Sequence, residues 1–302
     1  MVDQAEIHRM ARSEDVEERR EGAEQFGKNF AKLPDKKQAW DDLIWLTSDN
    51  NSEVRWRATK ALGITFSNVH DKKQAWDDLI KLTSCTDGFV CRDATYALWS
   101  AFAHVPDKKQ AWYDLIRLTQ VERFIVRMGT ASGIGEVYSQ ISDEYKQQAW
   151  SNLHILAQDR EKYVRMEVAR TLSSIYPHIP EEHKKQAWDD LIRLIQNIPT
   201  PMQYSTAEAL GAVYSQIPDE HKQQAWYDFH QFTQNNDRWV RWGIASALGG
   251  IYSYIPDEFK PQAWEDMHRL TQDKDDYVSE TAYYSLGRAS IFRSTVAEKK
   301  EN

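Results

Sequence analysis

Residues 35–47 read DKKQAWDDLIWLT, and variants of this stretch return along the chain. Its centre, Gln-Ala-Trp, occurs seven times, with the tryptophans Trp40, Trp76, Trp112, Trp150, Trp188, Trp226 and Trp264. The first two intervals are 36 residues long and the next four are 38. A fixed period of this size is typical of a solenoid, in which each repeat buries its apolar face only by stacking on its neighbours.

The quoted stretch has the pattern of an amphipathic helix, which we name helix A. Trp40, Leu43 and Ile44 recur at helical spacing and form one apolar stripe. Asp35 stands three residues before Gln38, which is the arrangement of a capping box at a helix N-terminus. We therefore interpret the repeated tryptophans as core residues; the alternative is an array of rings that stacks on a ligand.

A second helix, helix B, follows a polar turn in each repeat. Its apolar positions fall into three columns. The first column is Val54, Val90, Val126, Val164, Met202, Val240 and Val278. The second is Leu62, Leu98, Ile134, Leu172, Leu210, Leu248 and Leu286. The third is aromatic, namely Phe30, Phe66, Phe102, Tyr138, Tyr176, Tyr214 and Tyr252. We expect these rings to pack between successive repeats.

The repeats divide the chain into three predicted parts. Residues 1–34 form a partial N-terminal capping repeat, in which 15–33 are a helix B with Glu18 where other repeats have valine. Residues 35–293 form seven repeats in one continuous solenoid, and 294–302 form a charged flexible tail. Two prolines between Asn197 and Pro201 predict a bend in the array.

The opening of helix B carries a resemblance to a known family. Val54-Arg55 with Ala61-Leu62-Gly63, repeated as Val240-Arg241 with Ala247-Leu248-Gly249, resembles HEAT repeats of the phycobilisome-lyase-like subgroup. The resemblance implies an all-α fold, a right-handed α-α superhelix of the HEAT type, with helix B lining the concave side. It also implies a protein-binding scaffold. Several repeats depart from the pattern and are expected to be locally irregular, with Cys91, Gln203 and Ser279 in place of the arginine and Trp99 and Ser173 in place of the glycine.

Composition narrows the classes of partner. The net charge of −8 opposes broad attraction to nucleic acid or anionic lipid, so nucleic acid is an unlikely partner and no membrane partner is expected. The N-terminal residues lack the apolar stretch of a secretory signal, and no apolar run approaches the roughly 18 residues that span a bilayer. Cys85 and Cys91 lie in one repeat, which indicates a reducing compartment rather than a disulfide framework. We expect a cytoplasmic protein without a metal or other cofactor.

The candidate site lies on the face of helix B opposite its core, where the residues vary from repeat to repeat. It comprises Trp56, Arg92, Tyr96, Trp99, Met128, Tyr163, Met166, Arg170, Tyr204, Trp239 and Trp242. Tryptophan, tyrosine, methionine and arginine are enriched in the cores of protein interfaces, so we interpret this set as a partner-binding groove. The alternative is that some of these rings fold over neighbouring repeats.

Two charged columns have a structural and a functional interpretation. The arginines are Arg19, Arg55, Arg127, Arg165 and Arg241, and the helix A aspartates are Asp42, Asp78, Asp114, Asp190, Asp228 and Asp266. We favour an internal ladder of ion pairs between the two columns over a phosphate-binding surface. His154, His230 and His268 share another helix A column, and we favour hydrogen-bonded histidines over a shared metal ion because stacked helices lie about 8–10 Å apart.

These patterns predict a non-catalytic protein- or peptide-binding adaptor, with no catalytic residue and an oligomeric state left open. A glycine-rich phosphate loop, a nucleophile elbow and a zinc-protease motif are absent from the sequence. Two alternatives stay open. The family resemblance allows a phycobilin-lyase-like enzyme that handles a tetrapyrrole, and the groove aromatics allow a HEAT-like DNA-repair glycosylase, which the acidic charge disfavours.

Overall fold

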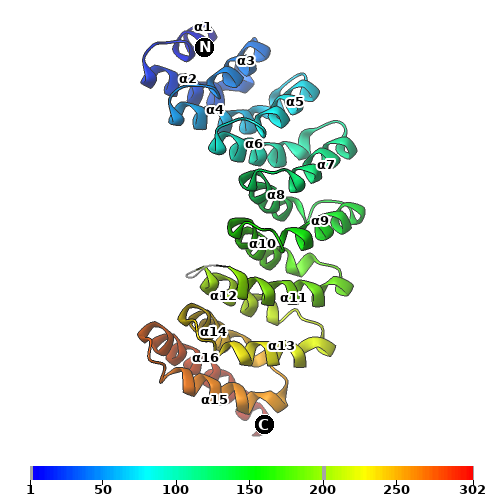
Figure 1. Ribbon diagram of the computed structural model, residues 1–302, viewed down its shortest axis with the longest axis vertical. Helices are drawn as coiled ribbons and strands as arrows, with labels where there is room; N and C mark the ends of the chain where they lie inside the picture. The colour runs from blue at the N-terminus through cyan, green and yellow to red at the C-terminus, as the bar shows by residue number, and fades with distance from the viewer. Residues whose placement is uncertain (1–2, 199–201, 302) are drawn as a thin grey trace. The chain divides into compact units, whose positions relative to one another are not determined.

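The computed structural model describes residues 3–198 and 202–301, with side chains to residue 294. Within these ranges every regular element is a helix, and successive helices pack as pairs (Figure 1). The chain forms two compact units, residues 1–137 and 138–302, which we describe separately as unit 1 and unit 2. Both units are stacks of two-helix repeats, so the predicted all-α solenoid fold is confirmed.

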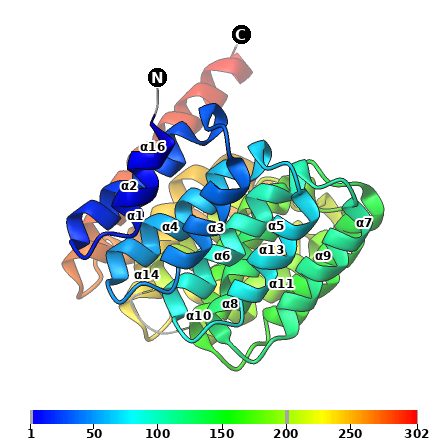
Figure 2. The same cartoon turned by 90° about the horizontal axis from the view of Figure 1, so that it is seen from above.

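Unit 1 contains four helix pairs. The A helices are α1 (Gln4–Ala11), α3 (Lys36–Leu46), α5 (Lys72–Leu82) and α7 (Lys108–Arg117). The B helices are α2 (Val16–Asn29), α4 (Ser52–Thr65), α6 (Gly88–Ala101) and α8 (Phe124–Val137). Figure 2 shows the two layers, with the B helices on one side of the unit and α3, α5 and α7 on the other.

Unit 2 repeats the same plan, and its first three A helices are longer than those of unit 1. Its A helices are α9 (Asp143–Leu156), α11 (Glu181–Asn197), α13 (Asp219–Phe232) and α15 (Lys260–Leu270). Its B helices are α10 (Lys162–Ile175), α12 (Gln203–Tyr214), α14 (Arg238–Ile251) and α16 (Asp276–Glu301). The change of period from 36 to 38 residues has its explanation here, because α13 has 14 residues where α3 has 11.

Helix starts follow the capping chemistry expected from the sequence. In unit 1 the side chains of Asp35, Asp71 and Asp107 each accept a hydrogen bond of 2.9 Å from the backbone three residues on. This bond satisfies one of the free N–H groups at a helix N-terminus. In unit 2, α13 instead follows Pro218 at its N-cap and carries two acidic residues in its first turn, which favour the positive end of the helix dipole.

The repeated tryptophans form the core, as predicted. Those from Trp40 to Trp226 are at most 5% exposed, and Trp264 is half-buried. The aromatic column lies between them: the Phe66 ring is 6.3 Å from Trp40 and 6.4 Å from Trp76 of the next repeat, edge to face in both contacts. Edge-to-face packing is a favoured geometry for aromatic pairs. The predicted packing of these rings between successive repeats is therefore confirmed at this junction.

Within each unit the B helices approach one another more closely than the A helices do. Small residues allow this approach: an added Cβ on Gly63 would stand 3.1 Å from the Cβ of Ala97, and one on Gly243 would stand 2.6 Å from the carbonyl oxygen of Tyr204. When one layer of a stack is spaced more tightly, the stack curves toward that layer. The B helices therefore line the inner face of each unit.

Three predictions at element boundaries need correction or stay open. The predicted partial repeat 1–34 contains a short helix A, because α1 packs on both α2 and α3. The last helix B does not end at Arg293, since α16 runs on to Glu301 through the segment predicted as a tail. The predicted bend at Asn197 to Pro201 falls largely on residues 199–201, which lie outside the described residues.

Candidate functional site

The candidate groove residues, all within the described ranges, divide between the two units. Unit 1 holds Trp56 on α4, Arg92, Tyr96 and Trp99 on α6, and Met128 on α8. Unit 2 holds Tyr163, Met166 and Arg170 on α10, Tyr204 on α12, and Trp239 and Trp242 on α14. Apart from Trp99, each of them is exposed or half-buried.

Trp99 does not belong to the surface, and its assignment to the groove is wrong. Its side chain is 1% exposed, and its ring meets Trp112 edge to face at 6.1 Å. At the two preceding junctions a glycine of one B helix meets an alanine of the next, as Gly63 meets Ala97. Here the tryptophan occupies the glycine position and Gly133 makes room for it, so the ring fills the space between two helices.

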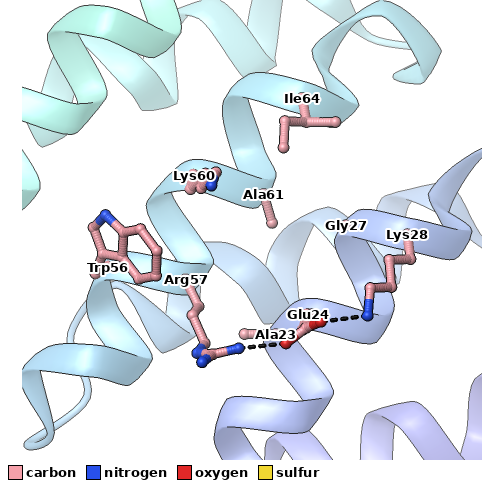
Figure 3. Close-up of a pocket in the computed structure, with 9 residues that line it drawn as sticks. All are labelled: Ala23, Glu24, Gly27, Lys28, Trp56, Arg57, Lys60, Ala61 and Ile64. Atoms are coloured by element: carbon pink, nitrogen blue, oxygen red, sulfur yellow. Dashed lines mark hydrogen bonds and ion pairs between the residues drawn. The ribbon is translucent and has the colours of Figure 1, made fainter.

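The groove in unit 1 is built around α4. Trp56, Lys60 and Ile64 are spaced by four residues, so they share one face of the helix and line two adjoining hollows. One hollow, of about 450 Å³, continues over α2 to Lys28, and Figure 3 shows the residues that line it. The other, of about 340 Å³, continues over α6 to Tyr96. We name this pair of hollows the unit 1 groove.

Apolar side chains stay open to solvent in the unit 1 groove. Ile64 is 61% exposed and Trp56 is 38% exposed, while Ala23, Gly27 and Ala61 form the floor beside them. Only Trp56 and Tyr96 of this groove were among the predicted residues. The spacing of four residues from Trp56 through Lys60 to Ile64 is the signal that could have identified the other two.

The rim of the larger hollow is basic. Its charged residues are Glu24, Lys28, Arg57 and Lys60, three basic side chains against one acidic. Glu24 pairs with both Lys28 and Arg57, as Figure 3 shows. The ammonium group of Lys60 lies 5.1 Å from the ring centroid of Trp56 in a cation–π arrangement. A positive hollow in a chain of net charge −8 is a local departure from the overall charge.

Unit 2 has an aromatic cluster on its own B helices, formed by Tyr204, Trp239, Trp242 and Tyr277. The Trp242 ring lies at its centre, with centroids 4.2 Å from Tyr204, 5.5 Å from Trp239 and 5.3 Å from Tyr277. Its indole N–H donates to the Thr281 hydroxyl at 2.9 Å. These rings contact neighbouring repeats, as the alternative interpretation expected, and Tyr277 is 62% exposed although it was not predicted.

Three arginines of the column, Arg19, Arg55 and Arg241, form ion pairs, but with partners other than those predicted. Arg165 donates to three backbone carbonyl oxygens instead. Arg55 and Arg241 donate to carboxylates in the turn of the following repeat, Asp87 at 2.9 Å and Asp273 at 2.6 Å. Each also donates to two backbone carbonyls of the turn before its own helix. We name this arrangement the arginine clamp; Arg19 forms it as well, with Asp49. The helix A aspartates are not its acceptors.

The helix A aspartates instead bond to the preceding repeat through one of two donors. The indole N–H groups of Trp40, Trp76 and Trp188 donate to Asp78, Asp114 and Asp228 at 2.9 to 3.2 Å. Where a histidine replaces the isoleucine of helix A, its Nδ1 takes this place: His8, His154 and His230 meet Asp42, Asp190 and Asp266 at 2.6 to 2.7 Å. Burial raises the pKa of Asp190, although its bond to His154 acts in the opposite direction.

The histidine column is thereby explained in part. His154 and His230 are hydrogen-bonded to buried aspartates, as favoured from the sequence, while His268 is exposed and its ring lies 5.2 Å from that of Trp264. Over the described residues, no group of three or more His, Cys, Asp or Glu side chains is arranged to hold a metal ion. In the same part of the chain no helix is both long and apolar enough to cross a membrane.

Acid is expected to weaken the arginine clamps. Burial alone would raise the pKa of Asp87 and Asp273, but hydrogen bonds from the arginine and the local backbone outweigh it and lower both pKa values below the ordinary 3.8. A carboxyl with a lowered folded-state pKa adds stability that is complete above its unfolded pKa and is lost as the pH falls through the folded value. The urea concentration at the midpoint of unfolding should therefore decrease as the pH is lowered below about 4.

The variant Asp273→Asn tests this link, since it removes one titrating carboxyl and keeps its shape. The variant should be less stable than the original chain at pH 7. The difference in stability should shrink as the pH is lowered to about 2, which is below the ordinary pKa range of a carboxyl group. A difference in urea midpoint that is the same at both pH values would contradict the role given to the clamp.

Comparisons with known proteins identify the fold of this chain but no function. No family model matches this sequence, and no curated protein matches it. Among solved structures, the chain is similar to the crystal structure of an engineered protein from the Northeast Structural Genomics Consortium, with 22% identity and a TM-score of 0.53. The similarity covers 96% of this chain and 79% of the other. It shows the fold alone. The chain is a helical repeat protein, and its HEAT subgroup stays a prediction.

Proposed function

We propose that this chain is a non-catalytic scaffold that binds a protein or peptide partner on its inner B-helix face, with the unit 1 groove as the main contact. One observation carries the proposal: Trp56 and Ile64 are large apolar side chains left exposed in two adjoining hollows, which together cover three successive B helices. Exposed apolar side chains gathered in a concave, polar-rimmed surface are typical of interaction sites.

The groove also indicates the chemistry of its partner. An apolar side chain, such as leucine or phenylalanine, fits between Ile64 and Trp56 over the small residues of the floor. Acidic residues beside that anchor complement Lys28, Arg57 and Lys60 on the rim. The partner segment that we propose is therefore an acidic peptide or helix with one or two apolar anchors.

The proposal extends to the finer expectations from the sequence. The aromatic cluster of unit 2 serves as a second contact, because its rings are presented on consecutive B helices of that unit. The scaffold has no catalytic residue and no cofactor, it is of the HEAT type, and it works in the cytoplasm. Purification of the chain from its native host, with identification of the proteins recovered, would provide the partner to test.

The exposed isoleucine of the groove provides a matched pair of variants. Ile64→Glu places a charge in the apolar part of the groove, whereas Ile155→Glu places it on α9, and both isoleucines are 61% exposed. Ile64→Glu is expected to weaken binding of the partner by about 2 kcal/mol, or roughly 30-fold in affinity, which is typical of a central interface residue. Ile155→Glu should leave binding unchanged.

Partner recovery from host extract, measured by mass spectrometry, checks this expectation, with circular dichroism to confirm that both variants fold. Partners that are lost with Ile64→Glu and retained with Ile155→Glu support the unit 1 groove. If the two variants recover the same partners in the same amounts as the original chain, the groove is not the contact.

A further inference from the structure

The two cysteines of the third repeat lie against each other. Cys85 is in the turn between α5 and α6 and is half-buried, whereas Cys91 is on α6 and fully buried. Their sulfur atoms are 3.1 Å apart, and both are free thiols. The sequence places them in one repeat, but only the structure shows that the turn folds back and brings the sulfurs into contact.

Cys91 occupies the position of the clamp arginine. Arg55 donates to the carbonyl oxygen of Asp49, six residues before it, at 2.7 Å. The Cys91 thiol donates to the carbonyl oxygen of Cys85, also six residues before it, at 2.9 Å. The cysteine thus repeats one bond of the clamp with a much shorter side chain.

An arginine at this position would lack its acidic partner. Arg55 pairs with Asp87, and the residue one period of 36 further along, opposite Cys91, is Arg123. Two arginines at this junction would repel each other, so the ionic part of the clamp is absent here. At this junction the cysteine pair, rather than an ion pair, can therefore fix the turn that contains Cys85 and Asp87.

We propose that Cys85 and Cys91 form a reversible thiol–disulfide site, whose oxidation by a small disulfide such as glutathione disulfide closes this turn covalently in place of the arginine clamp. The two sulfurs need to move from 3.1 Å to the bonding distance of about 2.05 Å, with only the short turn between them to adjust. In a reducing compartment such a bond is transient and regulatory rather than structural.

The exchange proceeds in two balanced steps. The Cys85 thiolate attacks glutathione disulfide, which forms a mixed disulfide and releases one glutathione thiolate. The Cys91 thiol then gives its proton to solvent and its sulfur attacks that of Cys85, which releases the second glutathione. Two protein thiols are oxidised and one glutathione disulfide is reduced to two thiols. Cys85 reacts first because it is partly exposed, whereas burial raises the pKa of the Cys91 thiol to about 12.

Closure would fix a residue that joins two repeats. Asp87 lies between the two cysteines, accepts the backbone N–H groups of Phe89 and Val90 at 2.8 and 3.0 Å, and bonds to Arg55 of the preceding repeat. A ring closed around Asp87 therefore holds the start of α6 and the clamp of Arg55 together. This inference is independent of the partner proposed above.

Mass spectrometry of the intact chain tests the site. The protein is equilibrated in glutathione buffers of increasing disulfide content and quenched with acid. It is then unfolded in urea and alkylated with excess iodoacetamide at about pH 8, where the thiols form thiolates. We expect a change from a doubly alkylated chain to an unalkylated chain that carries no glutathione and has a mass two hydrogen atoms below that of the reduced, unalkylated chain. Cys91→Ser should instead stop at a glutathione adduct on Cys85. An original chain that stops at the same adduct, or remains doubly alkylated where Cys91→Ser is fully modified, overturns the proposal.

Hydrogen exchange provides a second readout. Oxidation is expected to slow exchange of the backbone N–H groups at the start of α6 by about tenfold or more, since local opening of that turn is suppressed. The start of α14, held by the Arg241 bonds to its own turn, is the internal control and should exchange at an unchanged rate. Exchange at the start of α6 that does not change on oxidation would show that the bond does not replace the clamp.

Discussion

Gly133→Ala is expected to destabilise unit 1 by about 1–3 kcal/mol, the usual cost of overpacking a well-packed core. The added Cβ would stand 2.0 to 2.4 Å from atoms of the Trp99 ring. That ring is fully buried against Trp112, so it has no free space into which to move. A flexible side chain could shift at small cost, but a rigid indole between two helices cannot.

Gly287→Ala is the matched control, because an added Cβ there meets nothing within 4 Å. This change should stabilise α16 by about 0.5–1 kcal/mol, since glycine is unfavourable inside a helix. Urea denaturation followed by circular dichroism measures both effects. In the background Trp99→Ala the cost of Gly133→Ala should nearly vanish, because the two side chains no longer compete for space. A cost that is equal in both backgrounds would contradict the packing described here.

Asp266→Ala is expected to cost unit 2 about 2–4 kcal/mol, at the lower side of the range for breaking a buried charge pair. Asp266 is 1% exposed and accepts from His230 Nδ1 and from Arg269, each at 2.6 Å. His230 Nδ1 would lose its partner at the junction of two repeats, and Arg269 would keep only the Thr233 hydroxyl as an acceptor. The cost stays below the full range because Arg269 and, to a lesser degree, His230 retain contact with solvent.

Asp228→Ala gives the comparison in the same column. Asp228 is half-buried and accepts the indole N–H of Trp188 at 2.9 Å, a neutral donor. Its loss should cost about 1–2 kcal/mol, less than that of Asp266, because a hydrogen bond from a neutral donor contributes less. The two variants are compared by urea denaturation at pH 7. Equal losses, or a larger loss for Asp228→Ala, would show that the histidine–aspartate pair has no special weight at the junction.

The fold was predictable because two independent periods agree. The 36- to 38-residue spacing of the tryptophans fixes the repeat, and the 3.6-residue pattern around Trp40 and Val54 fixes its two helices. Burial of these columns confirms the reasoning. Helix α1 was missed because Gln4 stands where other repeats have tryptophan, although Asp3 with Ile7 and Ala11 already carries a capped helical pattern.

The candidate site was harder to predict. Aligned positions of the repeats show which way a residue faces on average, but not how much space the residue in the next repeat leaves for its side chain. Trp99 turned inward only because Gly133, in the next repeat, is smaller than its equivalents. The acidic partners of the arginines were misplaced for a similar reason. The sequence allows an arginine to pair with more than one of the nearby aspartates. The stacking of repeats brings Arg55 to the turn residue Asp87 rather than to an aspartate of helix A.

The unit 1 groove itself depends on a distance that no sequence pattern contains, namely the spacing between successive B helices. Trp56 was identified from its type, whereas Ile64 and Lys60 were not, since isoleucine and lysine are common on helix surfaces. Their exposure beside small residues of α2 and α6 makes the hollow. Side-chain type alone could not distinguish this position from the equally exposed Ile155.

Selection of a displayed random-peptide library on the intact chain tests the central claim most directly, with each enriched peptide then measured against Ile64→Glu and Ile155→Glu. We predict enriched peptides in which an apolar anchor is flanked by aspartate or glutamate. These peptides should bind Ile64→Glu roughly 30-fold more weakly and Ile155→Glu as tightly as the original chain. Enriched peptides that bind all three chains equally well would contradict the claim that the unit 1 groove is the binding site.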